Sequence, residues 1–201
     1  MKKVVKLSFV LFFFLMVTSV SAQELSFGVK AGVNFSNMVD DDGASGDIKI
    51  GPVAGVTVEY GIFEDVIFLF TGLDLSYKGF KGTNYNSSVT MNPIYLQIPI
   101  KAGSKLSISE KAKLVFEAGP YVAFGIAGKA TAKVKGISAG VDLFGDEGSL
   151  KRFDLGLEAG IGLEFNKLKF SAGYDYGFVN VYNDDEKIYN RNLFIAVGYR
   201  F

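Results

Sequence analysis

Hydrophobic and polar residues alternate along much of this chain. From Leu25 to Phe35 every second residue is apolar, and the segment 153–165 repeats the pattern with seven apolar positions in succession. A period of two residues is that of side chains on one face of a β-strand, whereas a helix repeats every 3.6 residues. The pattern predicts eight strands, at 24–35, 54–60, 69–78, 94–103, 114–124, 153–165, 168–178 and 193–201.

The connections between these strands alternate in length. The short connections are 61–66, 104–111 and 166–167, and the long ones are 36–50, 79–92, 127–151 and 179–191. Outer-membrane barrels have short periplasmic turns and longer extracellular loops. The predicted fold is therefore an all-β, eight-stranded antiparallel up-and-down transmembrane β-barrel, with both chain ends on the periplasmic side and four long extracellular loops.

The first 22 residues have the features of an export signal. Three lysines precede residue 7, residues 7–17 are almost all apolar, and Val-Ser-Ala at 20–22 fits a signal peptidase site. An uncleaved membrane anchor is the alternative, but 7–17 is shorter than the roughly 18 apolar residues that a spanning helix needs. We expect residues 1–22 to be a cleavable signal peptide and 23–201 to be one barrel domain.

Alternation alone does not say which face points inward, because a soluble lipocalin-like barrel has the same period with its apolar face inside. The glycine content of the polar face indicates which face points inward. Eight strands leave just enough interior for side chains, so residues of almost no volume are useful there. These glycines are Gly28, Gly32, Gly55, Gly72, Gly103, Gly119, Gly156, Gly160, Gly162, Gly173, Gly177 and Gly198. The sequence predicts a polar lumen and an apolar outer face in contact with lipid.

The polar face also carries charges of both signs, and the apolar face has aromatic residues near its ends. Unpaired ions away from solvent are costly, so we expect ion pairs across a plugged lumen. The charged residues are Glu24, Lys30, Glu59, Asp74, Lys78, Lys101, Glu117, Asp154, Glu158, Glu164, Lys169, Asp175 and Arg200. Two aromatic girdles are expected. One contains Tyr60, Phe165, Phe170, Tyr199 and Phe201, and the other Phe35, Tyr77, Phe124, Phe153 and Phe178.

Pro99 and Pro120 fall inside two of the predicted strands. Because proline removes a ladder donor, we expect a bulge or local break near each.

Four segments carry a family resemblance: 27–36 (FGVKAGVNFS), 95–101 (YLQIPIK), 118–122 (AGPYV) and 197–201 (VGYRF). They resemble the outer-membrane β-barrel proteins of Bacteroidetes called the porin or PorT family, over most of the chain after the leader. The resemblance implies an outer-membrane location and, through PorT, an accessory role in protein secretion. A terminal Phe201 after alternating apolar residues also resembles the signal that barrel-assembly machinery recognises.

Histidine and cysteine are absent. Without histidine there is no Ser-His triad and no histidine metal site, and without cysteine there is no disulfide and no lipid-modified cysteine. We expect no enzymatic activity, no catalytic residue, no cofactor and no metal. A carboxylate mechanism using Glu158 with Asp154 or Glu117 is the enzymatic alternative, and interior ion pairing is the ordinary interpretation of these groups.

Charge argues against nucleic acid as a partner. The chain has 21 Lys and Arg and 21 Asp and Glu, and three of the lysines belong to the leader, which leaves 18 basic against 21 acidic residues. A net negative chain has no basic field to attract nucleic acid.

Three further groups suggest binding, each with a plainer interpretation. Asp40-Asp41-Asp42-Gly43 with Asp47 offers oxygen ligands for Ca²⁺, or is a solvated acidic loop. Lys129, Lys133 and Lys135 could contact lipopolysaccharide phosphates, or mark an extended hairpin above the membrane. Tyr95 and Tyr121 could line a ligand site, or plug the lumen.

The leading functional prediction is an integral outer-membrane barrel with a structural or interaction role at the envelope. Its partners would be outer-membrane lipid and lipopolysaccharide, the barrel-assembly machinery, and an extracellular or envelope protein reached by the loops. The alternatives are a porin-like channel for small solutes or ions, a PorT-like secretion factor and a soluble periplasmic ligand-binding barrel. Eight strands argue against an open pore, because general porins use sixteen or more.

Overall fold

The computed structural model describes residues 25–40, 43, 46–63, 66–84, 87–134, 137–145, 148–183 and 186–201. The predicted signal peptide at 1–22 and its boundary with the barrel lie outside these residues. No helix in the described part of the chain is both long enough and apolar enough to span a bilayer. The strands are β1 (Leu25–Asp40), β2 (Asp47–Phe63), β3 (Ile67–Tyr77), β4 (Phe80–Asn84), β5 (Ser87–Ser107), β6 (Ala112–Val134), β7 (Ile137–Asp142), β8 (Phe153–Phe165), β9 (Leu168–Gly177) and β10 (Ile188–Arg200).

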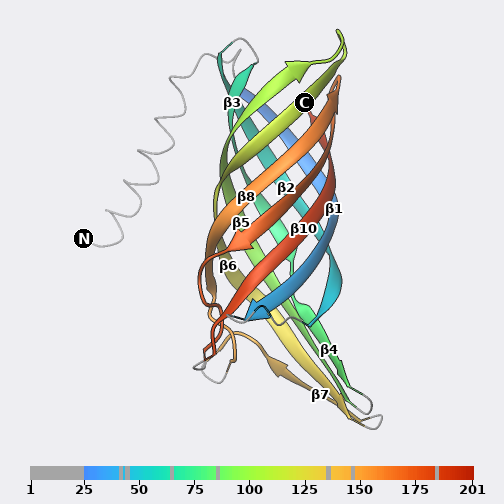
Figure 1. The fold of residues 1–201 in the computed structure, drawn as a ribbon, viewed down its shortest axis with the longest axis vertical. Coiled ribbons are helices and arrows are strands. Elements are labelled where there is room, and N and C mark those ends of the chain that lie inside the picture. Colours follow the sequence, from blue (N-terminus) through green and yellow to red (C-terminus); the bar gives the residue numbers. More distant parts are fainter. Residues whose placement is uncertain are drawn as a thin grey trace, which may run out of the picture.

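Eight of the strands form a closed antiparallel barrel. The ring runs β1-β2-β3-β5-β6-β8-β9-β10, and it closes where β1 pairs with β10, from Gly28 opposite Arg200 to Asp40 opposite Ile188. Each of the eight predicted strands matches one strand of this ring, to within one residue where it extends past the observed strand, so the predicted barrel is confirmed. Figure 1 shows the tilted strands wound around a common axis.

The two ends of the barrel differ. One end, here called the turn end, holds the turns 108–111 and 166–167 and the C-terminus. At the opposite end, the loop end, β4 and β7 project beyond the ring (Figure 1). β4 pairs with β5 and with the start of β2, and β7 pairs with the outer part of β6.

The predicted connections at the loop end are too long. The segments 79–92 and 127–151 contain β4, β7 and the outer parts of β5 and β6, β1 continues to Asp40, and β10 begins at Ile188. The physical reason is that these parts of the sheet lie beyond the apolar band. Outside lipid a strand has no reason to alternate hydrophobic and polar residues, so the pattern that predicts the ring does not reach them.

The apolar face points outward, as predicted. On β8, the side chains of Leu157, Ile161 and Phe165 are 48–49% exposed, whereas Asp154 and Glu158 are at most 1% exposed. Aromatic residues expected in both girdles are on this outer surface, among them Phe170 and Tyr199 toward the turn end and Phe124, Phe153 and Phe178 toward the loop end. A soluble barrel with an apolar interior is therefore excluded.

The sheet is interrupted next to the two prolines. Pairing of β5 with β6 stops between Pro99, opposite Tyr121, and Ala102, opposite Ala118, and the pairing of β3 with β5 has a gap beside Pro99. Pro99 and Pro120 cannot donate to the ladder. The local break predicted near them is confirmed.

Candidate functional site

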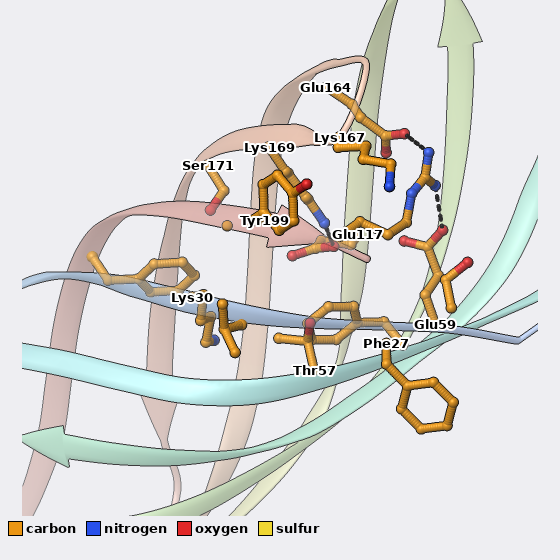
Figure 2. A pocket seen from close by; sticks show the side chains of 16 residues that line it. Phe27, Lys30, Thr57, Glu59, Glu117, Glu164, Lys167, Lys169, Ser171 and Tyr199 are labelled. Atoms are coloured by element: carbon orange, nitrogen blue, oxygen red, sulfur yellow. Dashed lines mark hydrogen bonds and ion pairs between the residues drawn. The ribbon is translucent and has the colours of Figure 1, made fainter.

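An ion cluster lies in the lumen nearest the turn end. Lys105 of β5 contacts the Glu59 carboxylate of β2, and its ammonium lies 3.0 Å from Glu164 Oε2 of β8. The Arg200 guanidinium of β10 lies 2.6 Å from Glu164 Oε1 and 3.6 Å from Glu59 Oε1. Figure 2 shows Glu59 and Glu164 on either side of this guanidinium. These contacts join β2, β5, β8 and β10 across the interior, and no two of these strands are neighbours in the ring.

A second cluster occupies the middle of the lumen. The Lys101 ammonium lies 2.7 Å from Glu117 Oε1 and 2.5 Å from Glu158 Oε1, and Lys169 is 2.5 Å from Glu117 Oε2. The ring of Phe70 lies beside this cluster, 4.4 Å from the Lys101 ammonium and 5.0 Å from that of Lys169. Buried charges are tolerable only when paired and hydrogen-bonded, and this arrangement meets that condition.

The third layer, toward the loop end, combines ions with amides and phenols. Asp154 accepts hydrogen bonds from Tyr121 Oη at 3.2 Å and from Asn190 Nδ2 at 2.9 Å. The Lys78 ammonium is 3.2 Å from Asp175 Oδ2 and 4.6 Å from the centre of the Tyr121 ring. Tyr121 is completely buried here, so its ring does not line an open surface.

An apolar cluster lies at the loop end of the lumen. It consists of Met38, Tyr95, Tyr121, Ala123, Leu143, Phe144 and Leu150. Phe144 lies in the connection after β7 and packs edge-on against Tyr95, with ring centres 5.9 Å apart. Arg152 fixes this connection, since it donates to the carbonyl oxygens of Gly125 at 2.8 Å and Phe144 at 3.3 Å.

One cavity opens into the lumen near the turn end, and Lys30, Glu117, Lys169 and Phe194 are among the residues that line it (Figure 2). Its volume is about 50 Å³. A water molecule needs roughly 10–15 Å³ by this measure, so the cavity has room for a few waters and not for a sugar or a peptide.

The carboxylates considered for an enzymatic mechanism are not brought into one open site. Glu117 and Glu158 share the Lys101 ammonium, whereas Asp154 lies in the next layer with Tyr121 and Asn190. All three are buried, and each has partners from the lumen itself.

The candidate groups at the loop end are only partly described. Asp40 and Asp47 end and begin strands, while Asp41 and Asp42 lie outside the described residues. Among the residues that the structure describes, no group of three or more Asp or Glu side chains could hold a metal ion. Lys129 and Lys133 lie on β6 opposite Asp142 and Ser138 of β7, which confirms the extended hairpin, and Lys135 lies outside the described residues.

This hairpin belongs to a sheet of four strands beyond the barrel, here called the outer sheet. It consists of β4, β7 and the outer parts of β5 and β6, where Ser87 is paired with Val134. β7 is its last strand, because one edge pairs with β6 and the other pairs with no strand in the described ranges.

Two features were missed from the sequence. The segment that adds Leu143, Phe144 and Leu150 to the apolar cluster has no period that would distinguish it from a loop. Arg191, on the outer face of β10, could have been found by continuing the alternation of residues 193–199 two positions back, where it meets a charge instead of a hydrophobe.

The family model for the outer membrane protein beta-barrel domain matches residues 21–183. The chain belongs to this family. It is accordingly a protein of the outer membrane, and the lipid-facing surface described above is the surface that this location requires. The narrower resemblance to PorT proteins of Bacteroidetes stays a prediction.

Several solved structures are similar in outline to this barrel. Ail, the attachment invasion locus protein of Yersinia pestis, is 19% identical, with 89% of this chain and 99% of that chain covered and a TM-score of 0.45. Neisserial surface protein A is 15% identical, with 87% and 97% covered and a TM-score of 0.46. The N-terminal β-barrel domain of Pseudomonas aeruginosa OprF is 10% identical, with 88% and 97% covered and a TM-score of 0.38. No curated protein matches the sequence. At these identities and scores no activity is carried over to this chain.

Proposed function

We propose that this outer-membrane barrel is an interaction protein of the cell envelope, which is anchored by a filled, non-conducting barrel and binds an extended segment of a partner protein along β7. The observation that carries the proposal is the second edge of β7, which pairs with no described strand. The outer sheet faces the cell exterior in this proposal, because outer-membrane barrels keep their short turns on the periplasmic side.

Strand length supports a binding surface outside the membrane. β5 has 21 residues and β6 has 23. A tilted strand crosses the hydrocarbon core with about 9–11 residues, so close to half of each strand is not needed for spanning. The excess forms the outer sheet.

The chemistry of β7 suits the addition of a strand. A free edge presents unpaired backbone N–H and C=O groups, and proteins usually protect such edges with lysine, proline or a bulge. Residues 137–141 (Ile-Ser-Ala-Gly-Val) contain neither proline nor charge, and Val141 is 67% exposed. An extended peptide can pair with this edge through main-chain hydrogen bonds, the mode called β-augmentation.

The orientation can be tested by cysteine labelling, because the chain has no native cysteine. Ser138→Cys on β7 is expected to react with a membrane-impermeant maleimide on intact cells. Ser109→Cys, in the turn between β5 and β6, is the matched control and is expected to react only after the outer membrane is opened. The reverse result contradicts the proposed orientation.

Strand addition itself is tested at Gly140. The Leu143 N–H donates to the Gly128 carbonyl at 3.0 Å, and in an antiparallel ladder these donors alternate, so the Gly140 N–H points to the free edge. A Cβ at Gly140 meets only Ala130 O at 3.6 Å. Gly140→Pro therefore removes the edge donor, and Gly140→Ala keeps it.

The readout is crosslinking in living cells from a photoreactive residue at position 138. Gly140→Pro is expected to abolish the crosslinked partner band, whereas Gly140→Ala retains it. Equal crosslinking in the two variants contradicts pairing along this edge.

A porin-like channel remains the alternative function, and single-channel recording in planar bilayers separates the two. Three layers of paired ions and an apolar cluster at the mouth support a closed lumen. We expect no discrete conductance steps from the purified barrel. Reproducible steps would overturn the non-conducting part of the proposal.

A further inference from the structure

Outside the outer sheet, Arg191 is the one charged residue on the outward face of the ring strands, within the residues that the structure describes. On the same face of β10, residues 193, 195, 197 and 199 are Leu, Ile, Val and Tyr. The outer part of β6 carries Lys129 and Lys133, but it belongs to the outer sheet; elsewhere the outward positions of the other seven ring strands are apolar, aromatic or uncharged polar residues. A lone charge on a lipid-facing surface needs a physical explanation.

The position of Arg191 along β10 is part of that explanation. It lies toward the loop end, paired with Asn37 of β1 and Tyr176 of β9. An arginine on the lipid face costs about 2–4 kcal/mol at the bilayer midplane and about 0–1 kcal/mol near an interface. Tyr176 and Phe178, both about half exposed, provide the aromatic surface typical of an interface at this level.

The guanidinium is held in place by the barrel. Its Nη1 atom donates to the carbonyl oxygens of Gly177 at 2.7 Å and of Asn190 at 2.9 Å. Its Cζ atom lies 3.6 Å from the centre of the Tyr176 ring and 5.7 Å from the centre of the Tyr189 ring. An arginine fixed in this way loses little further freedom when it binds a ligand.

Part of the guanidinium is left for a ligand. Both hydrogen bonds use Nη1, so Nη2 and Nε have no acceptor among the residues that the structure describes. An open groove of about 540 Å³ borders them, lined by Val39, Asp40, Gly43, Tyr176, Gly177, Phe178, Tyr189 and Arg191. The one described acidic group in this lining, Asp40, has an interaction of its own.

We propose that Arg191 and this groove bind a phosphate group, supplied by a phosphorylated glycolipid of the surrounding leaflet. The planar fork of arginine matches phosphate geometry, and the exposed rings of Tyr176 and Phe178 offer an apolar surface for the adjoining lipid. The assignment to the outer leaflet rests on the orientation given under the proposed function. The phosphate site itself does not depend on that orientation.

The test is a titration of the purified, folded, full-length barrel in detergent micelles, followed by native mass spectrometry. Three probes are compared: bisphosphorylated lipid A, the same lipid after its phosphates are removed, and inorganic phosphate. Arg191→Gln removes the charge, and Lys111→Gln, which removes an exposed charge from the turn between β5 and β6 at the opposite end of the barrel, is the matched control. Unchanged heat-modifiable gel mobility establishes that each variant is folded.

We expect Arg191→Gln to weaken binding of bisphosphorylated lipid A by roughly tenfold or more, since a hydrogen bond to a charged group contributes on that scale. Lys111→Gln should bind like the parent chain. The dephosphorylated lipid should bind the parent chain as weakly as the intact lipid binds Arg191→Gln. Preference for the lipid over inorganic phosphate supports a lipid source, and Arg191-dependent binding of inorganic phosphate alone supports the site with a free anion as its ligand.

The inference is overturned if Arg191→Gln binds the lipid like the parent chain, or if removal of the phosphates changes nothing. Micelles have no inner or outer leaflet, so this result is independent of the cysteine labelling. A reversed orientation on cells would leave the phosphate site standing and move it to the other leaflet.

Discussion

The Lys101 ammonium lies 2.5 Å from the Glu158 Oε1 atom, and both side chains are 1% exposed. Lys101 is on β5 and Glu158 is on β8, and β6 lies between these strands in the ring. The ion pair therefore ties strands that share no backbone hydrogen bonds. Because its charges are withdrawn from water, each one depends on the other.

Lys101→Met is expected to destabilise the barrel by about 3–5 kcal/mol, the usual effect of removing one partner of a buried ion pair. The Glu158 carboxylate would lose its cation, and Glu117 would keep only Lys169. The measurement is equilibrium unfolding in urea, with the barrel reconstituted in detergent micelles. The double variant Lys101→Met, Glu158→Gln should lose less than the sum of the two single changes, because it leaves no orphaned carboxylate at position 158. Additive losses contradict the coupling.

The buried phenols in the third layer should differ in their contribution to stability. Tyr121 donates to Asp154 at 3.2 Å, whereas Tyr95 only accepts a 3.5 Å hydrogen bond from Asn190. Tyr121→Phe leaves a buried carboxylate with one donor fewer, which costs about 1–3 kcal/mol. Tyr95→Phe should cost about 1 kcal/mol or less. Both are measured by the same urea titration, and a larger effect at Tyr95 would show that the contact with Asp154 is not what holds Tyr121.

The ring of the barrel was predictable because lipid imposes a rule on every strand. Leu157, Ile161 and Phe165 face acyl chains, whereas Asp154 and Glu158 face polar partners inside the lumen. A period of two therefore appears in the sequence. The orientation of the faces followed from glycine, since an eight-stranded barrel has little room inside.

The outer sheet and the candidate sites were harder to predict, because no such rule acts there. Ile137–Asp142 is a strand only by its pairing with β6, and Phe144 is buried only because Gly125 leaves room for its ring. Arg191 was not predicted to lie on a strand, because a charge at an apolar position of the alternating pattern is typical of a strand end. Its stacking on Tyr176 depends on the register between β9 and β10, which the sequence does not state.

Glycine at position 32 is required by the close approach of β1 and β10. A Cβ there would lie 2.7 Å from Ala196 Cα and 2.8 Å from Ala196 Cβ, which is too close for either strand to stay in place. Gly32→Ala should therefore cost about 1–3 kcal/mol, the range of overpacked sites. Gly198→Ala, in the same pair of strands, is the control because its Cβ would meet nothing nearer than 3.4 Å. The two are compared by urea unfolding, and equal stabilities would contradict the steric explanation.

Phe144 should control the local stability of the connection after β7 without affecting the ring. Its ring fills the space over Gly125 and packs against Tyr95, and its carbonyl accepts from Arg152. Phe144→Ala removes this anchor, so residues 143–150 should be cut faster by a protease added to the folded barrel, because cleavage follows local opening. Phe153→Ala is the matched control, because it removes a phenyl ring from the outward face, where Phe153 is 46% exposed. It should leave the rate of cleavage unchanged. The heat-modifiable mobility of both variants should match the parent chain, because β8 and its neighbours retain their ladders. If Phe144→Ala is cut no faster than Phe153→Ala, the aromatic contact with Tyr95 does not hold the mouth of the lumen closed.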